Sequence, residues 1–355
     1  MNLVAAPLAP RRILVRATNW VGDAVMSLPA LQALRKRYPE AHIAVLARPW
    51  VAGLYGREPF SDEIIPYTSP RGARDLAGKW RVAQDLRRRR FDAAVLLQNA
   101  FEAAMIVWLA GIPRRIGYNR DGRGGLLTDP IDVPKPGDTP RHERYYYLEL
   151  LRRAGILDTV PEVEAIRLDG APAAREQGIR RFRELGFAGD AIGVSPGAAY
   201  GPAKRWLPER FAEAAVRLAR ELGAGVAVFG SAGEKDLCEA VRSMVAGQGV
   251  RAENLGGKTS LEEFIELAAA CCVYLTNDSG AMHIASALGV PTVAVFGATD
   301  HTGTGPAGPL ARVVREPVDC SPCLLLECPI DHPCMTLVSA ERVVREALEV
   351  MGREN

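Results

Sequence analysis

Two polar segments in the second half of the chain have the composition of a phosphate-binding site. The first runs from Thr276 to His283 and follows a short apolar run, and the second, Pro202 to Trp206, contains Lys204. In an open α/β sheet, ligands bind at the carboxyl ends of strands. A helix N-terminus there offers free N–H groups and a positive dipole to an anion, and Lys204 would add a fixed charge. The two segments therefore predict a pocket for a phosphorylated ligand.

A third polar turn, residues 16–25, follows the first apolar run of the chain and carries Asp23 at the start of an expected helix. Two interpretations fit an acid at this place. Asp23 can complement the helix dipole, which is common, or it can act as a general base at the mouth of a cleft. The pattern alone favours the dipole interpretation.

Glu234 occupies a further strand-to-helix turn, residues 229–234. It could accept hydrogen bonds from a ribose, or cap the helix that follows, and its position alone favours the cap.

Four cysteines form a compact cluster in a Pro-rich loop: Cys320, Cys323, Cys328 and Cys334. Thiolates at such spacing can hold a structural zinc ion tetrahedrally, with His332 as a spare ligand. The alternatives are free buried thiols or a redox-labile pair.

The elements that must position these residues belong to a chain of 355 residues, of which 48% are hydrophobic and 24% charged. This length suggests two domains of a globular protein, and no apolar run approaches a membrane span. We interpret residues 1–10 as a short extension and not a signal peptide. Seven cysteines without a secretory signal favour reduced thiols and a cytoplasmic location.

Short β-rich runs alternate with helix-period segments along the chain, which predicts βαβ units and an α/β fold. Expected strands are 13–17, 43–47, 64–66, 93–97, 115–117, 191–195, 225–229, 272–276, 292–296 and 313–315. Expected helices include 23–38, 77–90, 208–222, 234–245, 260–270, 281–288 and 340–351. We place a linker at 158–172, between an N-terminal domain (1–160) and a C-terminal domain (173–338), with a final helix at 339–355.

Charge is distributed unevenly between the two halves. Residues 1–155 carry 25 Lys and Arg against 15 Asp and Glu, whereas the rest of the chain carries 19 against 27. Either the excess is a solvated surface, or the first half meets an anionic partner such as a membrane surface. The candidates for that contact are Arg87, Arg88, Arg89, Arg90, Arg114, Arg115, Arg120 and Arg123.

Three motifs occur in the order typical of one family. They are Asn-Trp-Val-Gly-Asp at 19–23, Pro-Gly through Gly-Pro-Ala-Lys-Arg-Trp at 196–206, and Asn-Asp-Ser-Gly-x-Met-His at 277–283. With them, the chain resembles the ADP-heptose:lipopolysaccharide heptosyltransferases, glycosyltransferase family 9, over about residues 12–351. The forms of the first two motifs are most like the heptosyltransferase II branch.

The resemblance implies a GT-B fold, in which two Rossmann-like domains with parallel sheets face each other across a cleft. The N-terminal domain would take a phosphorylated Kdo-lipid A acceptor at the inner face of the cytoplasmic membrane, and the C-terminal domain the ADP-heptose donor. The implied reaction moves L-glycero-D-manno-heptose to heptosyl-Kdo2-lipid A with inversion. It needs one base, no cofactor and no nucleic acid.

By match to the family's motifs, Asp23 is that base, which overrides the dipole interpretation. The resemblance assigns donor binding to Lys204, Glu234, Thr259, Asp278, Ser279, Gly280 and His283. It gives the four-cysteine loop no agreed role.

Two alternatives stay open at this point. One is heptosyltransferase I or another GT-B transferase with a different nucleotide sugar, because a fold alone does not fix the substrate. The other is a non-catalytic nucleotide-binding module whose cysteine loop senses a metal or redox state, against which the presence of both Asp23 and Lys204 argues.

Overall fold

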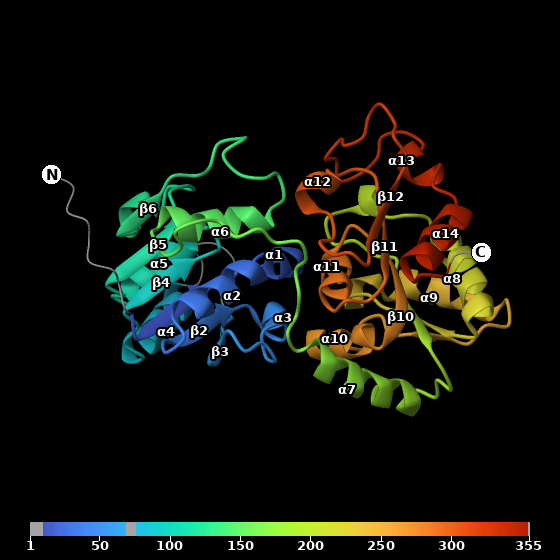
Figure 1. The fold of residues 1–355 in the computed structure, drawn as a ribbon, viewed down its shortest axis with the longest axis horizontal. Helices are drawn as coiled ribbons and strands as arrows, with labels where there is room; N and C mark the ends of the chain where they lie inside the picture. The colour runs from blue at the N-terminus through green and yellow to red at the C-terminus, as the bar shows by residue number, and fades with distance from the viewer. Residues whose placement is uncertain (1–9, 69–75, 354–355) are drawn as a thin grey trace. The chain divides into compact units, whose positions relative to one another are not determined.

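The computed structural model describes residues 10–68 and 76–353, which form two compact α/β units (Figure 1). The division falls between Glu162 and Val163, inside the segment 158–172 where we expect a linker. The extension expected at residues 1–10 lies almost entirely outside the described residues.

Unit 1 is built on a six-stranded parallel sheet with the strand order β3-β2-β1-β4-β5-β6. Its strands are β1 (Arg12–Arg16), β2 (His42–Ala47), β3 (Glu63–Pro66), β4 (Ala93–Leu96), β5 (Arg114–Tyr118) and β6 (Asp129–Ile131). The chain runs outward from β1 to β3 on one side and from β4 to β6 on the other. The order therefore reverses between β1 and β4, and in such sheets a ligand crevice lies outside the strand ends at this point.

Helices cover both faces of the unit 1 sheet, as a parallel sheet requires. They are α1 (Val21–Met26), α2 (Leu28–Arg37), α3 (Pro49–Ala52), α4 (Leu76–Arg88), α5 (Phe101–Leu109) and α6 (Arg144–Arg153). The single helix expected over 23–38 is two helices in the structure, because Pro29 starts a new first turn. At the break, Ser27 Oγ donates a hydrogen bond to the carbonyl of Ala24 at 2.8 Å.

Unit 2 repeats this design with the strand order β12-β11-β10-β7-β8-β9. Its strands are β7 (Ala191–Ser195), β8 (Gly225–Val228), β9 (Ala252–Asn254), β10 (Cys271–Asn277), β11 (Thr292–Phe296) and β12 (Ala311–Arg315). Here the order reverses between β7 and β10. The loop with Lys204 follows β7 and the turn with Asp278 follows β10, so both lie at the reversal point of unit 2.

Two helical layers enclose the unit 2 sheet. The helices are α7 (Ala171–Glu184), α8 (Pro208–Leu222), α9 (Lys235–Ala246), α10 (Leu261–Ala269), α11 (Gly280–Ala287), α12 (His301–Thr304), α13 (Pro333–Thr336) and α14 (Ala340–Val350). Helices α8, α9 and α14 pack on one face, and α7, α10 and α11 pack on the other. The last helix of the chain, α14, is thus part of the unit 2 core.

Helix α10 begins with a capping box. Ser260 Oγ accepts a hydrogen bond from the N–H of Glu263 at 3.2 Å, and Glu263 Oε2 accepts one from the N–H of Ser260 at 2.9 Å. This reciprocal pair satisfies two of the N–H groups that every helix leaves open at its start.

The carboxyl edge of each sheet, where its parallel strands end, is distinct from the amino edge, where they begin. Crossover helices run back against the strands, so the last turn of α4, with Arg87, lies toward the amino edge of unit 1. Arg114 and Arg115 begin β5 at the same edge. These basic residues therefore lie at the end of the unit opposite to Asp23.

The set of arginines expected to face a membrane needs one correction. Arg123 is fully buried. Its guanidinium donates to the carbonyls of Tyr118 and Gln98 and to the side chain of Asn99. It is a cation that holds two loops together, and nothing in a single sequence separates such an arginine from an exposed one.

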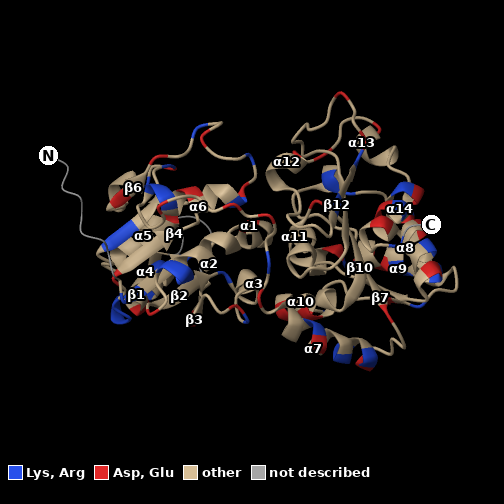
Figure 2. Ribbon diagram, viewed as in Figure 1, with Lys and Arg blue, Asp and Glu red and all other residues tan. Residues whose placement is uncertain are grey.

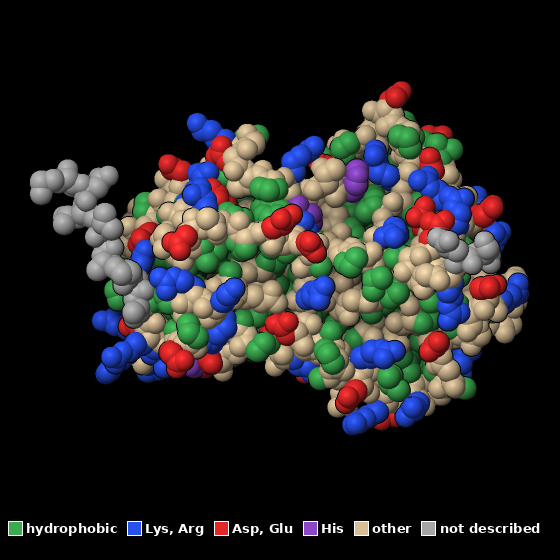
Figure 3. Space-filling model, viewed as in Figure 1, with side chains coloured by type: hydrophobic (Ala, Val, Ile, Leu, Met, Phe, Trp, Pro, Cys, Tyr) green, Lys and Arg blue, Asp and Glu red, His purple; other side chains and the backbone are tan. Residues whose placement is uncertain are grey.

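Of the other candidates, Arg88 and Arg89 pair with Asp85, and Arg114 pairs with Asp129. Basic residues alternate with acidic ones along the ribbon in Figure 2, and Figure 3 shows them interspersed over the visible face. No helix in the described parts of the chain is long and apolar enough to cross a bilayer.

Candidate active site

Asp23 lies in the first turn of α1, directly beyond the end of β1 at the carboxyl edge of unit 1. Its side chain is partly buried, and that burial raises the pKa of the carboxyl above its ordinary value. Among the described residues, it has neither a hydrogen bond nor an ion pair. A carboxylate without a partner and with a raised pKa can accept a proton from a bound hydroxyl.

The surroundings of Asp23 come from segments that are distant in sequence. Tyr147 of α6 and Tyr55 are buried, and the negative charge of Asp23 adds to the effect of burial in raising the pKa of each phenol. These rings withdraw the carboxylate from water on one side. Neither tyrosine carries a sequence signal, because an isolated tyrosine normally indicates core packing.

A second carboxyl lies close to Asp23. The pKa of Glu143, at the start of α6, is raised by burial and further by the charge of Asp23, while the charge of Arg120 lowers it. Glu143 is on the same face of α6 as Tyr147, four residues later. The two carboxylates thus repel each other, so the pair holds a proton more readily than either group alone.

The turn before Asp23 is fixed by a buried guanidinium. Arg16, the last residue of β1, donates to Asn19 Oδ1 at 2.8 Å and to the hydroxyl of Tyr67. Trp50 Nε1 donates to the carbonyl of Asn19 at 2.9 Å. The turn is therefore held by Arg16 at the end of β1 and by Trp50 in α3, which fixes where α1 begins.

In unit 2, the structure brings Lys204 and Asp278 together. Lys204 Nζ lies 2.5 Å from Asp278 Oδ2, and both side chains are largely buried. The hydroxyl of Thr299, just beyond β11, donates to the same carboxylate oxygen at 2.5 Å. Asp278 therefore orients the lysine, and Thr299 is a residue of this cluster that the sequence analysis does not find.

Asn277 joins the loop after β7 to the end of β10. Its Oδ1 accepts a hydrogen bond from the backbone N–H of Trp206 at 2.9 Å, and its Nδ2 donates to the carbonyl of Pro196 at 2.8 Å. The side chain is fully buried. This one amide thus sets the separation of Lys204 from Asp278.

The first turn of α11 points its backbone N–H groups at the same place. Ser279 is the N-cap, but its side chain makes no cap hydrogen bond and instead lies 3.2 Å from the hydroxyl of Thr276. The N–H groups that start with Gly280 therefore lack a side-chain cap. Such a terminus beside a lysine suits a phosphate, and His283 is buried one turn later.

Glu234 and Thr259 lie after the neighbouring strands β8 and β9. Glu234 Oε2 accepts hydrogen bonds from the N–H and the hydroxyl of Ser231, both at 2.8 Å, in a capping box. A Cβ at Gly197 would lie 2.0 Å from Glu234 Oε1, so the loop of Lys204 passes directly against this carboxylate. Thr259 is half-buried before the cap of α10. Ribose contacts by either residue stay predictions.

The four cysteines lie near one another in the loop that contacts Ala203. Burial raises the pKa of Cys334 to about 11, with contributions from the other three thiols. No three His, Cys, Asp or Glu side chains in the described ranges are arranged to hold a metal ion. His332, the expected spare ligand, has its Nε2 2.9 Å from the carbonyl of Ala203. The zinc site stays a prediction.

The cysteine loop supports the loop of Lys204. Besides the contact of His332, the carbonyl of Leu326 accepts a hydrogen bond from the N–H of Ala203 at 3.0 Å. The carbonyl of Leu324 accepts one from the hydroxyl of Tyr200 at 2.8 Å. Tyr200 in turn lies under the ammonium of Lys204, 5.1 Å from its ring centre.

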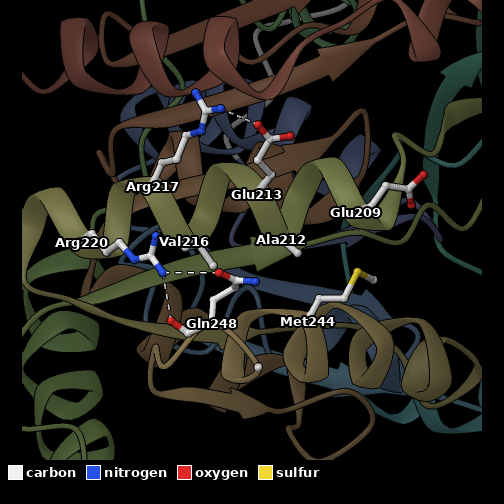
Figure 4. A pocket seen from close by; sticks show the side chains of 9 residues that line it. Glu209, Ala212, Glu213, Val216, Arg217, Arg220, Met244 and Gln248 are labelled. Atoms are coloured by element: carbon white, nitrogen blue, oxygen red, sulfur yellow. Dashed lines mark hydrogen bonds and ion pairs between the residues drawn. The ribbon is translucent and has the colours of Figure 1, made fainter.

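A separate groove of about 510 Å³ lies on the outer surface of unit 2, between α8 and α9 (Figure 4). An ion pair between Arg217 and Glu213 spans 2.6 Å beside it, and Arg220 bonds the carbonyl of Gln248 at 3.0 Å. It contains none of the predicted site residues, so we do not assign it to the active site.

Comparison with known proteins gives consistent matches. The sequence profile of glycosyltransferase family 9 (heptosyltransferase) matches residues 79–333. Lipopolysaccharide heptosyltransferase 2 of Escherichia coli is 36% identical over 86% of this chain and 88% of its own length. The protein of the same name from Salmonella typhimurium gives the same values. The solved structure of E. coli ADP-heptose lps heptosyltransferase II superposes with a TM-score of 0.80 at 30% identity, covering 96% of this chain and 99% of that one.

Proposed function

This chain belongs to glycosyltransferase family 9, the heptosyltransferases, and we propose that it transfers a heptose from ADP-heptose to the heptosyl-Kdo2-lipid A inner core of lipopolysaccharide. It is a glycosyltransferase of the GT-B fold class, with one parallel six-stranded sheet in each unit. The observation that carries the choice of acceptor is the 36% identity to heptosyltransferase 2 over most of both chains.

The chemistry proposed for Asp23 is general-base catalysis of a single displacement. A hydroxyl oxygen of the acceptor heptose forms a bond to the anomeric carbon of the donor as the bond from that carbon to the phosphate oxygen breaks. The hydroxyl proton passes to Asp23, and ADP leaves with the bonding electron pair. One displacement inverts the configuration, and the free, partly buried carboxylate of Asp23 supports this role.

On the donor side, the leaving diphosphate gains negative charge as the bond breaks. We assign its stabilisation to Lys204 and the N–H groups at the start of α11, because cations and uncapped helix ends favour such charge. Asp278 would act mainly by holding Lys204, since a carboxylate repels a phosphate. Glu234, Thr259 and His283 complete the proposed donor site.

The location proposed for this reaction is the inner face of the cytoplasmic membrane, where the enzyme would make peripheral contact with anionic lipid. An acceptor anchored in a bilayer requires such an approach. The overall excess of Lys and Arg in residues 1–155 supports it, although Arg87, Arg114 and Arg115 lie at the edge of unit 1 opposite to Asp23.

The decisive experiment offers the purified enzyme two acceptors, Kdo2-lipid A and heptosyl-Kdo2-lipid A, together with ADP-heptose. We expect a mass gain of one heptose on the second acceptor only. Product on the first acceptor would instead assign the enzyme to the heptosyltransferase I reaction. Turnover with UDP-sugars but not with ADP-heptose would contradict the proposed donor.

A further inference from the structure

Three exposed aromatic side chains follow the ends of three adjacent strands at the carboxyl edge of unit 1. Trp50 follows β2, Trp20 follows β1 and Phe101 follows β4, and their exposed fractions are 54%, 58% and 47%. The strands are neighbours in the order β2-β1-β4, and adjacent strands lie about 5 Å apart. The three rings are thus grouped on the edge that carries Asp23.

Trp50 is both exposed and held in place. Its only polar atom, Nε1, donates to the carbonyl of Asn19, and the guanidinium of Arg48 lies 5.7 Å from its ring centre. Arg48 is itself fixed by Glu102 at 3.1 Å. Because the indole N–H is already satisfied, what Trp50 presents to solvent is an apolar ring surface with little freedom to move.

The other two rings extend this surface on either side of the strand ends. Trp20 is the N-cap of α1, three residues before Asp23. Phe101 is the first residue of α5, next to the Glu102 that fixes Arg48. Large aromatic side chains left half-exposed at a reaction site are more informative than scattered apolar residues, because burying them is favourable.

We propose that Trp50, flanked by Trp20 and Phe101, is the platform on which a sugar ring of the acceptor stacks while its hydroxyl meets Asp23. The proposal rests on the proposed function and adds a specificity-determining residue to it. A pyranose presents a face of C–H groups that packs on an aromatic ring, while its hydroxyl groups point outward. Trp50 lies in direct contact with the turn that leads to Asp23, so a ring stacked there is brought to the base.

A membrane lipid is the other apolar partner that could cover these residues. Interfacial tryptophans usually place their N–H groups among lipid headgroups, whereas the N–H of Trp50 is turned inward to Asn19. A location beside the reacting group also favours a sugar over a bilayer, since the acceptor must reach Asp23. We therefore assign this aromatic surface to a sugar ring, and the experiment distinguishes a sugar from a lipid.

The experiment compares Trp50→Ala with Trp108→Ala on two acceptors, intact heptosyl-Kdo2-lipid A and the same oligosaccharide after removal of all acyl chains. Trp108 is the matched control: it is 48% exposed in the same unit, but at the end of α5 toward the opposite edge of the sheet. Calorimetric ADP affinity and thermal unfolding of each variant report whether the fold and the donor site are intact.

We expect Trp50→Ala to raise the acceptor KM about 3- to 10-fold on both acceptors, the usual worth of one aromatic contact. The donor KM should stay within twofold of wild type, and Trp108→Ala should behave as wild type. Trp50→Phe keeps a ring but loses the bond to Asn19, so it should restore most of the acceptor KM.

Three results would overturn the platform. They are an unchanged acceptor KM in Trp50→Ala, a defect confined to the acylated acceptor, which would indicate lipid contact, and a Trp50→Phe variant as impaired as Trp50→Ala, which would indicate a purely structural role. Absence of wild-type turnover on either acceptor would instead refute the proposed function itself, before any variant is compared.

Discussion

At the scale of single residues, the carboxylate proposed as the base in unit 1 has no partner, whereas the lysine proposed to bind phosphate in unit 2 is paired. Asp23 is a carboxylate with no partner in the described chain, whereas Lys204 is held by Asp278 at 2.5 Å. An unpaired base is ready to accept a proton. A paired lysine is already oriented, so little conformational freedom is lost when a diphosphate arrives.

The pH dependence of turnover should report the raised pKa of Asp23. A protonated carboxyl cannot act as a base, so kcat/KM should fall as the pH drops through this pKa, which lies above the ordinary value of 3.8. Asp23→Asn should lower kcat about 10²- to 10⁴-fold and remove this acid limb. An unchanged limb in Asp23→Asn would assign the titration to another group, of which Glu143 is the nearest candidate.

The contribution of Asp23 to folding stability changes with pH in the direction opposite to its contribution to turnover. The folded state binds the Asp23 proton more tightly than the unfolded state does. The contribution of Asp23 to the free energy of unfolding therefore decreases as the pH rises from the ordinary pKa to the raised one.

Loss of the lysine should affect the donor and not the acceptor. We expect Lys204→Ala to weaken ADP binding by about 1.5–3 kcal/mol, as for a lost hydrogen bond to a charged group. Part of this loss would come from the buried carboxylate of Asp278. Without Lys204 its negative charge is no longer balanced and repels the diphosphate, and of its two side-chain partners only the hydroxyl of Thr299 remains. Calorimetry with ADP measures the effect.

The double variant Lys204→Ala/Asp278→Asn is the control, because it removes the unpaired charge. It should recover stability and the part of the ADP affinity that the bare carboxylate of Asp278 costs, but not the part that Lys204 itself supplies. Wild-type affinity in Lys204→Ala would exclude the lysine from the donor site.

At the scale of elements, the proposed donor site depends on hydrogen bonds that connect one loop to another. Asn277→Ala should lower the free energy of unfolding by about 2–4 kcal/mol, because it leaves two buried backbone groups without partners. Urea unfolding measures this loss. Ser231→Ala, at an exposed cap after β8, should cost about 1 kcal/mol. Equal losses in the two variants would mean that Asn277 is only one more surface contact.

The cysteine loop makes similar contacts with the loop of Lys204. The zinc ion predicted for it can be tested directly. Protein purified without chelator should contain close to one zinc ion per chain, the content of a four-thiolate structural site. Since this loop contacts Ala203 and Tyr200 beside Lys204, removing the metal should also weaken ADP binding. A zinc content below about a tenth of that, with four freely titratable thiols, would leave the loop as a metal-free support.

The elements themselves could largely be read from the sequence, and the exceptions have physical causes. All ten expected strands are present, because the strands of a parallel sheet buried on both faces are continuous apolar runs. Two of the four edge strands, β6 and β9, were missed: each has three residues with polar or proline composition. The other two edge strands, β3 and β12, contain adjacent β-branched residues and could be predicted.

The site was predictable where a motif places a residue after a strand. Asp23, Lys204 and Asp278 could all be named in this way, and the structure puts each at a point where the strand order reverses. Thr299, Tyr147 and Trp50 could not, because their roles depend on contacts between distant segments. A threonine after β11 differs from any other loop threonine only in its bond to Asp278.

At the scale of the whole molecule, the excess of basic residues in 1–155 should attract the protein to an anionic membrane. Binding to vesicles that contain anionic lipid should weaken steeply with added salt, because the attraction is screened within about 8–10 Å at physiological ionic strength. Arg87→Glu/Arg88→Glu alters two exposed basic residues of unit 1. It should reduce binding by about 1 kcal/mol per residue lost.

A sedimentation assay with and without anionic lipid measures this binding. Arg175→Glu/Arg180→Glu makes the same charge change on exposed positions of α7 in unit 2, and it should leave binding unchanged. Equal binding to neutral vesicles, or none at low salt, would mean that the basic excess is only a solvated surface.

The five tryptophans are divided between the units in a way that makes the protein its own optical reporter. Trp20, Trp50, Trp80 and Trp108 all belong to unit 1 and are about half-exposed, whereas Trp206 belongs to unit 2 and is 1% exposed. Trp206 lies against Phe211 and hydrogen-bonds the carbonyl of Val338. Emission from unit 1 is therefore expected at long wavelengths and emission from unit 2 at short ones. The blue edge of the spectrum then follows the melting of unit 2 alone, without any label.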